Sequence, residues 1–174
     1  MDDELHLILQ RAQDGDREAF AELVTRYKHQ VYRHAMGMLG DRMEAEDVVQ
    51  EAFVKVFYSL SKLESAYAFS SWMTRIVSNL CLDRLKKRKI TAPVAERYPE
   101  EMERIGYNDS HTNMSIEEAM DHLSEEHRAA IALHDIQGYR YEEMAEMLGI
   151  PVGTVKSRLF AARLALRKEW KKDD

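Results

Sequence analysis

Two helical turns near the C-terminus carry side chains that can bind DNA. Lysine and arginine bind phosphates and base edges, serine hydroxyls donate or accept hydrogen bonds, and a phenylalanine ring contacts the thymine methyl group. Apolar residues between them recur at a spacing of three to four, which predicts a helix with one buried face: Val155, Leu159, Ala162 and Leu166. The candidates for DNA contacts are Thr154, Lys156, Ser157, Arg158, Phe160 and Arg163.

The residues just before this set predict the elements that position it. A first short helix has an apolar face formed by Tyr141, Met144, Ala145 and Leu148. Gly149 can adopt the left-handed conformation that ends a helix, and Pro151 suits the first turn of the next one. Together they predict a helix-turn-helix, in which the first helix braces the second and the second presents its basic face to DNA. The alternative is a helical hairpin whose basic face is merely solvated.

Charge is distributed in blocks along the 174 residues, whose net charge is −6. Residues 70–90 hold six cations against one acid, and residues 152–172 hold seven against one. Residues 91–127 instead hold ten acids against two arginines. A phosphate backbone senses charge within a screening length of about 10 Å, so local patches matter more than the total. The two basic segments therefore allow a nucleic-acid partner.

Composition narrows the class of protein further. Only seven glycines and three prolines interrupt the chain, which favours long helices over a sheet. Cys81 is the single cysteine, so the chain has no internal disulfide and no multi-cysteine zinc site. No apolar run approaches the roughly 20 residues of a membrane span, and the first ten residues are acidic where a signal peptide is basic. We expect a cytoplasmic protein without membrane insertion.

Four helices are predicted in the first ninety residues. They cover about 4–13, about 17–39 after Asp16 as N-cap, about 42–60 after Asp41 as N-cap, and about 71–89. The third helix is expected to bury Val48, Val49, Ala52, Phe53, Val56, Phe57 and Leu60. Its outward face near the start is acidic and polar, and contains Glu46, Asp47, Gln50 and Glu51.

The fourth helix combines an aromatic ring, an amide and a basic run. Trp72, Asn79 and the cations from Arg75 onward suit a groove that holds unstacked bases, because aromatic rings stack on bases and cations follow the backbone. The alternative is that Trp72 is core and the basic run is a solvated last turn that the helix dipole favours. The connection before this helix, residues 61–71, holds Tyr67 and Phe69.

A break in periodicity separates the two basic segments. Residues 91–114 contain prolines, a glycine and many acids, and this length is long for a loop inside one domain. Ser115 and Ser124 then suit N-caps of two further helices, the second with the apolar face Ala129, Ala130, Leu133 and Ile136. We predict an all-α chain with a helical domain over 1–90, an acidic linker over 91–114 and a helix-turn-helix domain over 115–174.

Enzymatic chemistry finds little support in the residues. The spacing of His122, His127 and His134 matches neither the HExxH pattern nor the Glu-x-x-His pairs of di-iron bundles. The sequence has no glycine-rich phosphate loop, no GxSxG and no second cysteine beside Cys81. We therefore expect neither catalytic residues nor a metal or other cofactor.

The order of these segments resembles that of the bacterial extracytoplasmic-function (ECF) sigma factors, a family of two-domain transcription initiation factors. The resemblance is carried by FAELVTRYKHQVY from Phe20, AEDVVQEAFVKVF from Ala45, FSSWMTRIVSNLCLDRLKKRK from Phe69 and YEEMAEMLGIPVGTVKSRLFAARLALRK from Tyr141. These strings cover most of the chain outside the linker. The resemblance implies a protein that binds core RNA polymerase and gives it promoter specificity.

The resemblance also implies roles for particular residues. The contacts with the β′ clamp helices of core polymerase would come from Glu46, Asp47, Gln50 and Glu51. The contacts with the −10 element would come from Trp72, Arg75, Asn79, Arg84, Lys87 and Arg88, with the connection 63–71 helping to hold a flipped base. The predicted helix-turn-helix would bind the −35 element. Further implied partners are the β flap of polymerase and an anti-sigma factor.

Two departures from the family pattern affect these roles. Arg140 stands where members often carry a serine or threonine N-cap, which makes it a candidate phosphate contact instead. Ala161 stands where some members carry a basic residue, so one base contact is absent at that position.

A second hypothesis is a stand-alone helix-turn-helix regulator whose N-terminal bundle dimerises or senses a ligand. Such a regulator would bind a palindromic site by itself, with half-sites about one helical turn apart. A sigma factor would bind free DNA poorly and require core polymerase. The separated basic segments and the polar Glu46–Glu51 face favour the sigma factor. A helical metalloenzyme, the third class, lacks a ligand set.

Overall fold

A computed structural model describes residues 3–91 and 115–170, and every regular element within those ranges is helical. The chain divides into two compact units, Met1–Cys81 and Leu82–Asp174. The all-α prediction is therefore confirmed for the described residues. The predicted linker lies outside them apart from Thr91, and the predicted domain boundaries stay a prediction.

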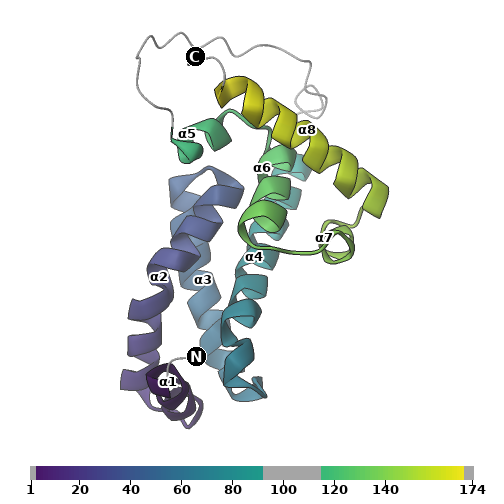
Figure 1. Cartoon of the computed structure of the whole chain (residues 1–174). Helices are drawn as coiled ribbons and strands as arrows, with labels where there is room; N and C mark the ends of the chain where they lie inside the picture. The colour runs from purple at the N-terminus through teal and green to yellow at the C-terminus, as the bar shows by residue number, and fades with distance from the viewer. Residues whose placement is uncertain (1–2, 92–114, 171–174) are drawn as a thin grey trace. The chain divides into compact units, whose positions relative to one another are not determined.

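Three long helices and one short helix build most of the first unit (Figure 1). They are α1 (Asp3–Gln13), α2 (Arg17–Leu39), α3 (Arg42–Ser59) and the first half of α4 (Phe69–Thr91), with short 3-10 turns η1 (Leu60–Lys62) and η2 (Ala66–Ala68) before α4. α2 packs along α3, and α1 packs against α2. The carboxylate of Asp16 accepts hydrogen bonds from the backbone N–H groups of Glu18 and Ala19, so the predicted N-cap is confirmed.

The core of the first unit contains side chains of α2, α3 and the start of α4. Leu23, Val48, Val56 and Phe69 are fully or almost fully buried. The ring of Phe69 meets that of Tyr27 edge-on, with centroids 5.2 Å apart. The predicted burial of Phe57 is wrong, because its ring packs edge-on against Phe20 at the rim and stays 49% exposed.

A polar pair is buried in the same core. Nε2 of His34 lies 3.0 Å from Oγ of Ser78, and both side chains are buried. Burial lowers the pKa of His34 to about 4, because desolvation penalises the charged imidazolium. The unfolded chain then binds more protons than the folded one between about pH 4 and pH 6.5, so stability falls as the pH falls through that window.

We expect the first unit to be about 2 kcal/mol less stable at pH 5 than at pH 7 through His34 alone. Urea unfolding followed by Trp72 fluorescence, in a chain carrying Trp170→Phe, measures this loss. His34→Gln removes the titrating group and should flatten that part of the pH dependence. An equal loss in His34→Gln would show that other groups cause it.

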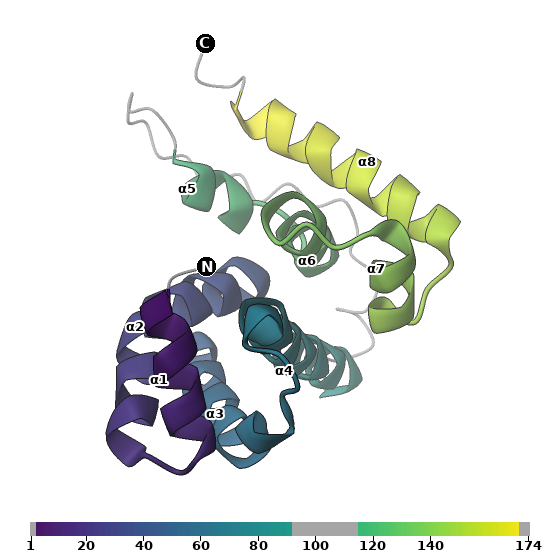
Figure 2. The same ribbon diagram turned by 60° about the horizontal axis from the view of Figure 1, so that its bottom comes forward.

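The second unit is a compact helical domain with a helix-turn-helix. It contains α5 (Ile116–Asp121), α6 (Glu125–Ile131), the π-helical turn η4 (Ala132–Ile136), α7 (Tyr141–Leu148) and α8 (Val152–Trp170). α8 packs across α6 and α7 (Figure 2). Its core contains Leu133, Met144, Val155, Leu159 and Ala162, all buried.

The predicted turn between α7 and α8 is confirmed. Gly149 has φ 66°, a left-handed conformation that side chains disfavour, and its N–H donates to the carbonyl of Ala145. Pro151 follows after Ile150, and its carbonyl accepts from the N–H groups of Thr154 and Val155. The predicted burial of Ile136 is wrong: it is 56% exposed, because η4 forms an i+5 hydrogen bond from Gln137 N–H to Ala132 and so shifts the helical register.

Candidate nucleic-acid and polymerase interfaces

One face of α8 gathers three of the predicted DNA contacts. Successive helical residues are about 100° apart, so Lys156, Phe160 and Arg163 lie on the same side. All three are exposed, and the Phe160 ring is 72% exposed. Arg167, which sequence reasoning left out, extends this face by one more turn and is also exposed. We call Lys156, Phe160, Arg163 and Arg167 the α8 face.

Arg158 points away from the α8 face. Its side chain is only 18% exposed, and its Nη2 lies 3.0 Å from Oε2 of Glu126 on α6. Glu126 also accepts from Lys89 within the same unit, and these cations, Lys89 first, lower the pKa of its carboxyl. Arg158 would have to leave Glu126 to reach DNA, so its assignment to the −35 contacts stays a prediction.

The remaining −35 candidates lie outside the α8 face. Thr154 and Ser157 are exposed in the first two turns of α8, and Oγ of Ser157 donates to the carbonyl of Thr154 at 3.0 Å. Arg140 is exposed at the N-cap position of α7, where its N–H donates to Oε2 of Glu143 at 2.9 Å. Glu143 thus accepts from the N-cap backbone N–H, as the glutamate of a capping box does, and the Arg140 side chain remains exposed.

Helical geometry divides the −10 candidates of α4 into two groups. Trp72, Arg75 and Asn79 share one side of the helix; Arg75 and Asn79 are exposed and Trp72 is half-buried. Lys86, which belongs to the predicted basic run but was not among the −10 candidates, is exposed on the same side. We call Trp72, Arg75, Asn79 and Lys86 the α4 face.

The other three candidates lie elsewhere on α4. Arg84 and Arg88 are on the opposite side from Arg75 and are half-buried, and Lys87 is exposed between the two sides. Nη1 of Arg88 lies 2.7 Å from Oε1 of Glu125, which belongs to the same compact unit. The structure therefore does not bring these three residues together with the α4 face.

An accessible ring precedes the α4 face. Tyr67 is 77% exposed in η2, whereas Phe69 is fully buried, so only one of the two aromatic residues in the connection 63–71 is available to a base. The amide of Gln13 fixes the start of this connection by donating to the carbonyls of Leu60 and Leu63, at 3.1 and 2.8 Å.

The predicted polymerase contacts form an exposed stripe on α3. Glu46, Asp47, Gln50 and Glu51 are all exposed in its first three turns. Arg42 pairs with Glu46 at 3.0 Å and Lys55 with Glu51 at 3.8 Å, which is surface pairing of small energetic weight. Sequence reasoning missed that the stripe continues into exposed apolar side chains, namely Val54, Phe57 and Tyr58.

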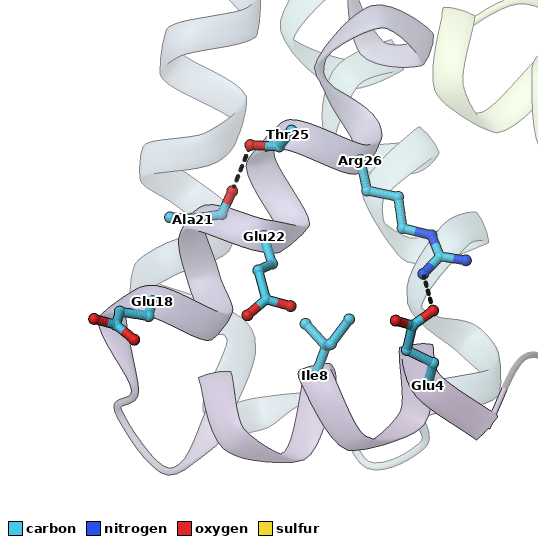
Figure 3. Close-up of a pocket in the computed structure, with 7 residues that line it drawn as sticks. All are labelled: Glu4, Ile8, Glu18, Ala21, Glu22, Thr25 and Arg26. Atoms are coloured by element: carbon cyan, nitrogen blue, oxygen red, sulfur yellow. Dashed lines mark hydrogen bonds and ion pairs between the residues drawn. The ribbon is translucent and has the colours of Figure 1, made fainter.

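A pocket of about 490 Å³ lies elsewhere, between α1 and α2 (Figure 3). Its lining is rich in acids and includes Glu4, Glu18 and Glu22, with Arg26 Nη1 3.8 Å from Glu4 Oε2. None of the candidate interface residues lines it. The described residues also hold no group of three metal-ligating side chains, and none of their helices has the length and apolarity that crossing a membrane requires.

Comparison with known proteins identifies the family. Two family models match in order along the chain, Sigma-70 region 2 over residues 23–90 and Sigma-70 region 4 over residues 113–166. The ECF RNA polymerase sigma factor SigW of Bacillus subtilis (strain 168) is 33% identical over 178 residues, which cover 92% of this chain and 94% of that protein. The chain belongs to the ECF sigma factor family.

Further matches agree with this family. The ECF sigma factor SigE of Mycolicibacterium smegmatis is 36% identical over 88% of this sigma factor, which spans 63% of the length of SigE. The structure of the sigma factor RpoE from Bartonella quintana, solved with the anti-sigma factor NepR, matches with TM-score 0.58 and 24% identity, covering 89% of this chain and 98% of that one. That likeness concerns the fold. As an ECF sigma factor, the protein directs core RNA polymerase to specific promoters.

Proposed function

We propose that this sigma factor attaches to core polymerase through α3, opens the −10 element with α4 and reads the −35 element with α8. It acts in the cytoplasm as a binding and specificity subunit and has no catalytic residues of its own. The observation that carries the proposal is that a region 2 match and a region 4 match stand in order in one chain. A stand-alone regulator needs only the second of these.

The polymerase interface is the α3 stripe. Its carboxylates suit a basic partner surface, as the β′ clamp helices would provide, and complementary charge steers association. Val54, Phe57 and Tyr58 adjoin the carboxylates on the same helix and supply the apolar and aromatic groups that carry much of the energy at protein interfaces. The carboxylates would thus steer association with polymerase, and the apolar side chains would stabilise the complex.

The −10 interface is the α4 face together with Tyr67. Arg75 and Lys86 follow a phosphate backbone, while Trp72 and Tyr67 offer rings on which unpaired bases stack. Stacking rewards only bases that have left the duplex, so it favours the melted strand over the paired one. This preference is what promoter opening requires.

The −35 interface is the α8 face. An α-helix fits the major groove, where each base pair presents a distinct pattern of donors, acceptors and methyl groups. Lys156 and Arg163 supply donors and Phe160 supplies an apolar surface on one exposed side of α8. The second unit would also meet the β flap of polymerase, and an anti-sigma factor of the kind bound to the Bartonella RpoE would be its regulatory partner.

Titration of a labelled promoter duplex, with and without core polymerase, tests this function against the alternative. The sigma factor alone should bind the duplex weakly, and the same chain with core should form a tight complex. Tight binding of the free chain as a dimer to a palindromic site would support the stand-alone regulator instead.

Phe160 should discriminate thymine from uracil at one position of the −35 element. Its exposed ring has an apolar contact to offer, and the C5-methyl is the apolar group of the major groove. Replacing the thymines one at a time by deoxyuridine should weaken wild-type holoenzyme binding about threefold to tenfold at one position, which is about 1 kcal/mol.

Phe160→Ala is the matched variant for this measurement. It should bind thymine and deoxyuridine duplexes equally at the sensitive position while keeping any other preferences. If the variant retains the full thymine preference, another residue reads the methyl group.

A further inference from the structure

Asp135 and Arg163 form a two-point ion pair beside the α8 face. Nε of Arg163 donates to Oδ2 of Asp135 at 3.0 Å, and Nη2 donates to Oδ1 at 2.5 Å. The residues are 28 positions apart, one in the turn η4 and the other in the fourth turn of α8. A parallel pair of this kind fixes the plane of the guanidinium as well as its position.

This pairing leaves the other edge of the guanidinium available. A guanidinium has five N–H donors in a rigid fork, and Asp135 occupies the edge formed by Nε and one hydrogen of Nη2. Three donors remain, two on Nη1 and one on Nη2, and one N–H of each nitrogen forms the end edge of the fork, directed away from the carboxylate. The side chain of Arg163 is 48% exposed, so solvent reaches it on the α8 face. Two parallel N–H groups match the O6 and N7 acceptors of guanine.

Tyr141 contacts the cations Lys156 and Arg163 and so provides a second support for this part of α8. Its ring lies beneath Nζ of Lys156, which is 5.6 Å from the ring centroid, and packs against His134 with centroids 4.8 Å apart. His134 precedes Asp135 directly, and its Nδ1 donates to the carbonyl of Tyr139 at 2.8 Å. The pKa of Arg163 is raised by its hydrogen bond to Asp135 first, and also by Tyr141. One connected cluster thus holds two of the three cations of the α8 face, Lys156 and Arg163.

The backbone of η4 departs from α-helical hydrogen bonding around Asp135. The N–H of Gln137 donates to the carbonyl of Ala132 at 3.0 Å, a wider turn than that of an α-helix. Such π-helical turns are rare in proteins overall, and those that occur are often found at functional sites. Asp135 is exposed in this turn. A carboxylate beside a DNA-binding face repels phosphates, so its presence there lowers general affinity for DNA.

We propose that Asp135 is a positioning residue of the −35 interface, which holds Arg163 so that its outer edge pairs with one guanine. This inference rests on the proposed function of α8. A base contact accounts for the fixed orientation better than a phosphate contact, because phosphate contacts anchor the protein while base contacts specify sequence. Asp135 thus lowers the general affinity for DNA and increases the discrimination between DNA sequences.

The test uses holoenzyme reconstituted from core polymerase and the full chain. A duplex library randomised over the −35 element is bound, and the bound pool is sequenced; affinity for one unrelated duplex is measured alongside. The variants are Asp135→Ala, Arg163→Ala and their combination. Glu146→Ala is the matched control, since Glu146 is an exposed acid of α7 for which the described residues show no ion pair.

The wild type should enrich guanine at one position. Asp135→Ala should reduce that enrichment about tenfold and leave the other positions unchanged, while its affinity for the unrelated duplex rises because a repelling charge is gone. Arg163→Ala should flatten the same position, the double variant should flatten it no further, and Glu146→Ala should retain the enrichment.

Distinct results would overturn the inference. If Arg163→Ala removes the guanine preference and Asp135→Ala keeps it, Arg163 reads the base without Asp135. If Asp135→Ala lowers enrichment at every position and affinity for the unrelated duplex too, its role is structural. If Arg163→Ala weakens all sequences equally, Arg163 binds a phosphate. If Arg163→Ala changes neither the guanine enrichment nor the affinity for the unrelated duplex, the proposed −35 interface itself is wrong.

Discussion

Charge reversal on α3, through Asp47→Lys with Glu51→Lys, should abolish assembly with core polymerase. The two carboxylates are exposed, lie one helical turn apart and face a partner that we propose to be basic. Close charge pairs across an interface couple strongly, and reversal turns attraction into repulsion, so we expect a loss of at least about 100-fold in affinity. Titration of core polymerase with the labelled sigma factor measures it.

Glu18→Lys with Glu22→Lys is the control for this prediction. It makes the same change of charge at the same spacing, on α2 beside the pocket of Figure 3. This variant should bind core as the wild type does, and both variants should keep the helical circular dichroism of the wild type. Unchanged binding by the Asp47 and Glu51 variant would remove α3 from the polymerase interface.

Trp72→Ala should slow promoter opening by about tenfold to 100-fold. A base stacked on an aromatic ring gains about 1–3 kcal/mol, and that gain exists only after the base leaves the duplex. Trp72 is half-buried on the α4 face, with its ring centroid 6.1 Å from that of Phe69, so the core orients it while one side remains accessible. Permanganate reactivity of the −10 thymines over time reports the rate of opening.

Two comparisons separate this effect from misfolding. Trp72→Phe keeps an aromatic surface and should retain most of the opening rate. A template with a pre-melted −10 region should restore transcription by Trp72→Ala, because melting no longer has to occur. Opening at the wild-type rate by Trp72→Ala would contradict the role of this ring, and failure on the pre-melted template would point to a damaged fold.

Local chemistry explains why the helices themselves could be predicted. Asp16 and Asp41 accept hydrogen bonds from the first backbone N–H groups of α2 and α3, and Gly149 adopts the left-handed conformation that ends α7. Each of these signals acts within four residues of its own position, so a single sequence reveals it. The buried stripe of α8 follows from a spacing that is equally local.

The division of residues between helix faces was predicted less well. Arg84, Arg88 and Arg158 were chosen by charge, and the structure places them away from the faces that hold Arg75 and Arg163. The signal was present, because their helical spacing alone separates them. The exposure of Ile136 had no such signal, since it depends on the π-helical hydrogen bond of η4.

Contacts between distant residues could not be predicted at all. Asp135 reads in the sequence as an ordinary acid in a helix, and nothing near it indicates Arg163 as its partner. The pair exists because α6, η4 and α8 pack together, which brings residues 28 positions apart into contact. The same holds for Glu126 with Arg158, and for the apolar extension of the α3 stripe, whose exposure depends on which residues α2 covers.

Mapping of transcription starts on genomic DNA tests the central claim most directly. Core polymerase from the bacterium that encodes the chain would transcribe that DNA with and without the purified sigma factor. Our account predicts that the sigma factor adds a distinct set of starts, preceded by one shared −35 element and one shared −10 element. If the starts were the same with and without it, this account of the protein as a promoter-specificity subunit would be wrong.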